Sequence, residues 1–172
     1  MAQLAGLESE FEVAGPLEIA EDAVGVGSTD FWGISFAASS FEQGPMPEEE
    51  LERKVALLEA AWRFFDDVRG RVSPEMRKGP RGGGRDRDGI VGHTFRTEIG
   101  DFAKRVGVRS LLEAMETTEG VRAHREQFVA AMREYNAASR MAGRSWTIPF
   151  LVRHTAFHAL DHAWEMEDKD LS

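Results

Sequence analysis

Apolar residues recur at helical spacing in several long segments of this 172-residue chain. The clearest is PEEELERKVALLEAAWRFFDDV, where the apolar stripe consists of Leu51, Val55, Leu58, Trp62 and Phe65. Residues spaced by three or four lie on one face of a helix, and a helix with one apolar face must bury it against a neighbour. Four such segments favour an all-α fold, a four-helix bundle around one core.

Start and stop signals give the bounds of the four helices. Pro47 and the three glutamates behind it begin the first, because the first turn needs no proline amide and acids stabilise a helix N-terminus. Asp86 or Asp88 is the expected N-cap of the second helix, and Gly107 ends it. The predicted helices cover residues 47–70, 86–106, 119–140 and 147–167.

Composition limits the partners. Hydrophobic residues make up 42% and charged residues 30% of the chain, as in ordinary globular domains. The net charge of -9 disfavours nucleic acid or an anionic membrane as the main partner. No apolar run approaches the ~20 residues of a membrane span, and the first residues lack signal-peptide features. We therefore expect a cytoplasmic protein that acts on a small molecule.

The chain contains no cysteine. This excludes disulfides, thiolate nucleophiles and cysteine-ligated zinc. A bound metal must therefore use histidine, carboxylate or water ligands. Any thiol chemistry must use a thiol that a cosubstrate supplies.

Residues 1–45 have a different pattern from residues 46–172, which form the predicted bundle. Scattered β-formers, broken by Gly, Pro and Ser, indicate a non-helical N-terminal extension that consists of short strands or an extended arm. The aromatic residues expected to pack on the bundle are Phe31, Trp32, Phe36 and Phe41. The last three of these also offer apolar surface for a symmetric homodimer.

Three of the five histidines lie four residues apart on the predicted last helix: His154, His158 and His162. Side chains at this spacing have Cβ atoms roughly 5–6 Å apart, so two adjacent ones can chelate one divalent ion. Each further step of four turns the side chain by about 40°, so the third ligand must come from another element. His93, early in the second predicted helix, is the candidate.

Charged residues and one further histidine lie near these positions or on the neighbouring predicted helix. Asp161 and Glu165 are within reach of the histidines and can orient an imidazole, as carboxylates around metal sites commonly do. Asp161 can equally pair with a surface arginine. His124 is flanked by Arg122 and Arg125, and we interpret it as solvent-facing rather than as a ligand.

HTAFHALDHAWE in the last helix and GPRGGGRDRDGIVGHTFRTE at the start of the second resemble the DinB/YfiT-like superfamily, over roughly residues 47–170. The resemblance implies an up-down-down-up bundle with a three-histidine divalent metal site. His93 matches the ligand on the second helix, and His158 and His162 match the HxxxH pair on the fourth. The pair of His154 and His158 is the alternative register.

The resemblance also implies a function. Superfamily members include thiol transferases in which the metal activates the thiol of a small cofactor. We therefore expect a metal-dependent S-transferase that uses a low-molecular-weight thiol, or a hydrolase that uses metal-activated water, with zinc or nickel as the metal. Glu98 and Glu165 are the candidate catalytic bases. The alternative is a non-catalytic stress protein that binds a metal or a small molecule.

The loop KGPRGGGRDRDG enters the second helix close to His93. Its cations Arg81, Arg85 and Arg87 precede or begin a helix N-terminus, where anions bind favourably, so they are candidates to hold a cofactor or substrate carboxylate. The loop lacks the GxxxxGK[ST] pattern of a P-loop. A solvated basic connector is the competing interpretation.

Overall fold

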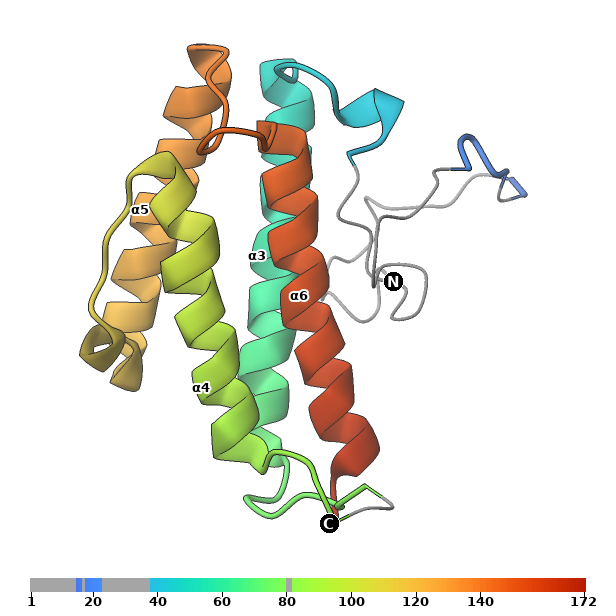
Figure 1. Ribbon diagram of the computed structural model, residues 1–172, viewed down its shortest axis with the longest axis vertical. Helices are drawn as coiled ribbons and strands as arrows, with labels where there is room; N and C mark the ends of the chain where they lie inside the picture. Colours follow the sequence, from blue (N-terminus) through green and yellow to red (C-terminus); the bar gives the residue numbers. More distant parts are fainter. Residues whose placement is uncertain (1–14, 17, 23–37, 80–81) are drawn as a thin grey trace.

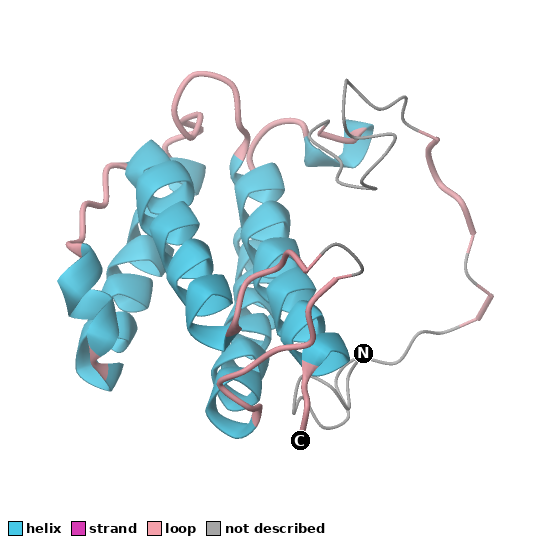
Figure 2. Cartoon of the chain, turned by 60° about the horizontal axis from the view of Figure 1, so that its bottom comes forward, coloured by secondary structure: helices cyan, strands magenta, loops and turns pink. Residues whose placement is uncertain are grey.

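The computed structural model describes residues 15–16, 18–22, 38–79 and 82–172. Within these residues there are four long helices and no strand (Figures 1 and 2). The long helices are α3 (Glu48–Arg71), α4 (Arg87–Thr97), α5 (Thr118–Ala137) and α6 (Ile148–Lys169). The shorter helical turns are η1 (Ser40–Glu42), η2 (Glu98–Phe102), η3 (Ala103–Val106) and η4 (Leu112–Glu116). The expectation of an all-α chain with four long helices is confirmed.

Side-chain caps fix the starts of three of these helices. The carboxylate of Asp86 accepts a hydrogen bond from the Gly89 amide (2.7 Å) and begins α4. The Thr117 hydroxyl accepts from the Gly120 amide at the start of α5 (3.0 Å), and Thr147 caps α6 in the same way. Each cap satisfies an amide that the first turn leaves unpaired.

Contacts between helix ends show how the helices run. The C-terminal ends of α3 and α6 meet, because the Ser73 amide donates to Asp170 Oδ1 (2.9 Å). The start of α3 meets the end of α5, where the Met46 amide donates to Asn136 Oδ1 (2.8 Å). The Gly143 amide, just before α6, donates to the Arg105 carbonyl at the end of η3 (2.8 Å). Thus α3 and α6 run one way and α4 and α5 the other, as Figure 1 shows.

The second predicted helix continues to Val106 but changes its hydrogen bonding after Thr97. A π-helical turn covers η2 and a 3-10 turn covers η3, before Gly107 ends the helix with a φ of 83°. The π turn is one residue wider than an α turn, and Glu98 and Phe102 are both buried on it. A continuous α-helix over 86–106 was therefore only partly right.

The apolar stripes meet in one core. The five stripe residues of α3 are all buried, and Phe65 and Leu58 have no exposed surface. The largest fully buried side chains of the core are Leu58, Phe65, Ile90, Phe128, Met132, Phe150, Leu151 and Met166. No helix in the described part of the chain is long and apolar enough to span a bilayer.

Most of the N-terminal extension, including three of the four aromatic residues expected to pack on the bundle, lies outside the described residues. Phe31, Trp32 and Phe36 lie outside the described residues. Phe41 is 70% exposed, so the expectation that it packs on the bundle is wrong. Its neighbour Glu42 is buried instead, and it is paired with Arg153 of α6, whose Nη2 donates to Glu42 Oε2 (3.0 Å).

Replacing Gly120 by alanine should destabilise the protein by about 2 kcal/mol, although alanine is the better helix former. A Cβ at position 120 would lie 1.8 Å from the Ala114 carbonyl oxygen, so the connector before α5 must move. Gly70 near the end of α3 is the matched control, since a Cβ there meets nothing within 4 Å. Urea unfolding of Gly120→Ala and Gly70→Ala measures both effects, and equal stabilities would contradict the expected contact.

Candidate metal centre

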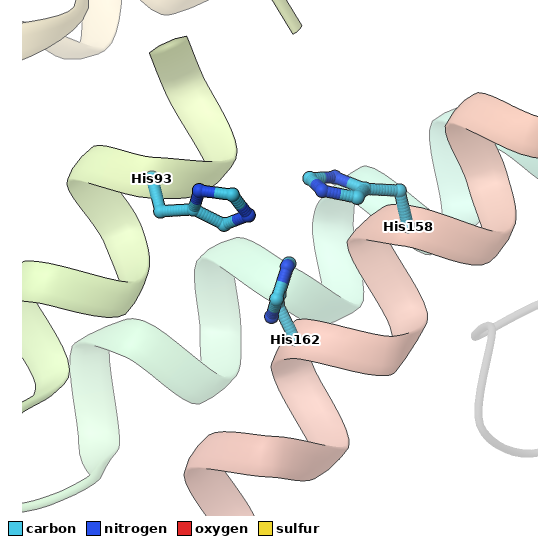
Figure 3. A group of neighbouring side chains, drawn as sticks. All are labelled: His93, His158 and His162. Atoms are coloured by element: carbon cyan, nitrogen blue, oxygen red, sulfur yellow. The ribbon is translucent and has the colours of Figure 1, made fainter. Parts of the chain in front are cut away.

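The histidines predicted as metal ligands lie on two antiparallel helices. His93 is six residues into α4, and His162 is seven residues before the end of α6. The start of α4 and the end of α6 lie at the same end of the bundle (Figure 1), so the two residues lie at a similar distance from that end. His158 lies one turn before His162. Figure 3 shows the three rings pointing toward one another across the space between α4 and α6.

The three imidazoles form a compact cluster. The ring centroids of His93 and His162 are 4.9 Å apart, those of His158 and His162 are 4.5 Å apart, and those of His93 and His158 are 5.5 Å apart. Each ring offers one nitrogen within 4.8 Å of the other two. Ligands of a tetrahedral zinc ion at ~2.1 Å lie about 3.4 Å from one another, so small side-chain rotations suffice to bring them onto one ion.

Glu165 fixes the orientation of one ring. His162 Nδ1 lies 2.8 Å from Glu165 Oε2, and a carboxylate only accepts, so Nδ1 carries the hydrogen. The lone pair is then on Nε2. Burial alone would raise the pKa of Glu165, but hydrogen bonds from Lys169 and His162 outweigh it and lower that pKa. Lys169 was not predicted as part of the site, although its position four residues after Glu165 is the usual spacing of a helical ion pair.

Two of the rings are held neutral. Burial, followed by smaller contributions from the neighbouring histidines and Arg85, lowers the pKa of His158 from 6.5 to about 3. Burial, followed by the charge of Arg85, also lowers the pKa of His93. A neutral imidazole has the free lone pair that a metal requires. His93 and His158 therefore each offer a lone pair to a cation near neutral pH.

His154, the alternative ligand, lies in different surroundings. Its ring stacks on Phe150 with centroids 5.3 Å apart, and it makes edge contacts with Phe102 and Trp146. It does not belong to the group whose nitrogens converge. The structure thus brings His93 together with the later histidine pair and places His154 in an aromatic cluster beside it.

Glu98, a candidate base, lies elsewhere in the bundle. It is 2% exposed, and its Oε2 accepts a hydrogen bond from Trp62 Nε1 (2.7 Å). His124 Nε2 lies 3.4 Å from its other oxygen. His124 is itself 2% exposed, and its Nδ1 is 2.8 Å from Ser110 Oγ. The interpretation of His124 as solvent-facing is therefore wrong.

The arginines of the glycine-rich loop have different positions. Arg81 lies outside the described residues. Arg85 is exposed, and its charge contributes to the lowered pKa of both His93 and His158. Arg87 donates to Asp88 Oδ1 (2.8 Å) instead. Of the two described arginines, Arg85 is thus the one that acts electrostatically on the cluster.

We found no match to this chain among protein-family models, curated proteins or solved structures.

His154 should make the protein sensitive to acid. Burial, then the charges of Arg153 and Arg105, lower its pKa to about 4, so the unfolded chain takes up the proton first as the pH falls below 6.5. The stability that neutral His154 contributes is present above pH 6.5 and is lost as the pH falls to about 4. The shift corresponds to a loss on the order of 3 kcal/mol.

Urea unfolding at several pH values between 7 and 4 checks this for the wild type and for His154→Phe. The phenylalanine variant should show a shallower fall in unfolding free energy with pH. The comparison uses the slope of the unfolding free energy against pH. A constant change in stability caused by repacking around the new side chain therefore does not affect it. Parallel slopes in the two proteins would show that His154 does not titrate as expected.

Proposed function

We propose that this chain is a divalent-metal-binding protein of the DinB/YfiT-like type, with His93, His158 and His162 as ligands. In this proposal it is a metal-dependent enzyme that acts on a small molecule, either by transfer to the thiol of a small cosubstrate or by hydrolysis. The observation that carries the proposal is the convergence of three imidazole nitrogens, one from each ring, within 4.8 Å of one another.

The arrangement of the helices supports the family part of the proposal. The resemblance requires one ligand on the second helix and a pair on the fourth. The cluster has one histidine on α4 and two on α6. The parallel directions of the first and fourth helices, which follow from the contacts between helix ends, support the proposed up-down-down-up connectivity.

The chemistry of the ligand set supports the catalytic part. Three imidazole ligands leave coordination positions open, and a zinc or nickel ion held there would supply Lewis acidity to an oxygen or sulfur donor. His93 and His158 are only partly buried, so a small molecule can approach from outside. The chain has no cysteine, so a thiol must come with a cosubstrate.

One observation favours the alternative, a non-catalytic binder. Glu98 is hydrogen-bonded to Trp62, away from the histidine cluster, and Glu165 is paired with His162 and Lys169. Glu98 therefore lies outside the group of clustered histidines, and both oxygens of Glu165 are already paired. Catalysis at the cluster would rest on the metal and on groups that the substrate brings.

Replacing His158 by alanine should weaken zinc or nickel binding at least about a hundredfold, because two remaining imidazoles hold a divalent ion poorly. Isothermal titration of untagged, metal-free protein measures the dissociation constant. His154→Phe is the matched control on the same helix and should leave that constant unchanged. Equal affinities for His158→Ala and wild type would remove the basis of the proposal.

Activity assays on the same proteins distinguish a metal-dependent enzyme from a non-catalytic metal-binding protein. Metal-loaded wild type is assayed for consumption of a small thiol in the presence of an electrophile, and for hydrolysis of an activated ester. The enzyme proposal requires metal-dependent turnover that His158→Ala lacks and His154→Phe retains. Tight metal binding without turnover in either assay would favour the non-catalytic binder.

Replacing Glu165 by alanine should weaken metal binding about tenfold or more, since the carboxylate holds the His162 ring in its ligating tautomer. Asp161→Ala removes the same charge from an exposed position one turn earlier on α6 and controls for the loss of charge alone. A competition titration with a chromophoric zinc indicator compares the two variants. Equal losses would show that Glu165 acts only through its net charge.

A further inference from the structure

A second polar cluster lies apart from the metal centre. Its members are Glu98 at the start of η2, Ser110 in the connector between η3 and η4, and His124 on α5. None of them belongs to the group of converging histidines. Glu98 and His124 are each 2% exposed, whereas Ser110 is only partly buried. The cluster therefore joins two buried titratable groups to a serine that is partly open to solvent.

The three side chains form a chain of polar contacts. Ser110 Oγ lies 2.8 Å from His124 Nδ1, which is hydrogen-bond distance. On the other side of the ring, His124 Nε2 lies 3.4 Å from Glu98 Oε1. In the described part of the chain, neither Nε2 nor Oε1 has any other hydrogen-bond partner. Buried polar atoms are nearly always paired, and a shortening of about 0.5 Å would pair these two with each other.

Donors from two helices hold the Glu98 carboxylate in place. Trp62 Nε1 on α3 donates to its Oε2 (2.7 Å), and Arg125 Nε on α5 lies 3.8 Å from its Oε1. The positive charge of Arg125 stabilises the negative charge of the buried carboxylate. Because Trp62 occupies Oε2, the other oxygen is the one left to face the His124 ring.

The carboxylate determines which ring nitrogen of His124 carries the hydrogen. A carboxylate only accepts hydrogen bonds, so the Nε2 that faces Glu98 carries it. The lone pair is then on Nδ1, where it accepts the hydrogen bond from the Ser110 hydroxyl. A hydroxyl bonded to a base, with the base oriented by a third group, is the arrangement that activates a serine for nucleophilic attack.

Access to the serine comes from an exposed segment. Arg109 and Leu111, on either side of Ser110, are both exposed. A small substrate can therefore approach Ser110 from solvent, while the base and its carboxylate stay buried behind it. Burial excludes water from the contact between His124 and Glu98 and strengthens it.

We propose that Ser110 is the nucleophile of a second, metal-independent site that hydrolyses small carboxylic esters, with His124 as its general base and Glu98 as its positioning residue. Ser110 Oγ attacks the ester carbonyl carbon, and its proton passes to His124 Nδ1. The bond to the leaving alcohol breaks, and the alcohol departs with that proton. Water then attacks the acyl-serine and gives a proton to Nδ1, which returns it to Oγ as the acid leaves.

The first test labels the full chain after removal of metal with EDTA. A fluorophosphonate probe should form one Oγ–P bond per chain with loss of fluoride, and peptide mapping by mass spectrometry should place it on Ser110. Ser110→Ala should abolish the labelling. Ser73→Ala, at another partly buried serine, is the matched control and should retain it. An unlabelled wild type, or labelling that persists in Ser110→Ala, would overturn the proposal.

Turnover separates this site from the metal centre. The metal-free wild type should hydrolyse 4-nitrophenyl butyrate, and His158→Ala should do so at the same rate. Ser110→Ala should lose this hydrolysis while its zinc affinity stays unchanged. Hydrolysis that requires added zinc and disappears in His158→Ala would assign the activity to the metal centre and overturn the second site.

Glu98→Gln tests the positioning residue. Because Trp62 donates to one end of the side chain, the amide oxygen should stay there and the NH2 group should face His124. The ring then accepts at Nε2 and carries its hydrogen on Nδ1, where it cannot take the Ser110 proton. The labelling rate should fall about a hundredfold or more.

Nitrogen-15 spectra of the His124 ring read the tautomer directly. The hydrogen should be on Nε2 in the wild type and on Nδ1 in Glu98→Gln, a change that a merely structural role of the carboxylate does not require. A wild-type ring with its hydrogen on Nδ1 would overturn the proposal, and this measurement does not depend on whether the variant folds. Equal labelling rates in the wild type and a folded Glu98→Gln would do the same.

Discussion

The bundle depends on α6 burying two faces at once. This helix packs along α3 on one side and against α4 on the other, and 11 of its 22 residues are buried. Ala159 and Ala163 are almost completely buried there. The histidines of α6 lose water for the same reason that its apolar residues do. Burial that holds the fold together therefore also keeps His158 uncharged and fit to bind a cation.

Features that depend on neighbouring residues in the chain could be predicted from the sequence. The apolar stripe of α3, the Asp86 cap and the helix-ending Gly107 each act within a few residues, and all three are found in the structure. The spacing of His158 and His162 is local in the same way. Bringing His93 to them needed the direction of α4 relative to α6, which spacing alone does not contain.

Features that depend on packing could not be predicted in this way, and His124 shows why. The charged residues next to it in the chain, such as Arg125, suggested that the His124 side chain faces solvent. Adjacent residues on a helix, however, point in different directions. Val121 and Phe128, which share its face, are both buried. The hydrogen bond from Trp62 to Glu98 likewise appears only once distant helices are side by side.

The π turn in the second helix has an angular consequence. Nine residues separate His93 from Phe102, and on an unbroken α-helix they would rotate by about 900°, which places them on opposite sides. A π turn takes up one extra residue, so the rotation between His93 and Phe102 falls to about 800°. This is two full turns and about 80°, so the two side chains lie about 80° apart around the helix axis. Phe102 consequently faces α6, where its ring meets those of His154 and His158 at 5.4 and 5.3 Å. The one extra residue in the π turn therefore rotates the Phe102 ring from the far side of the helix toward the histidine cluster. There it forms an apolar wall beside the cluster.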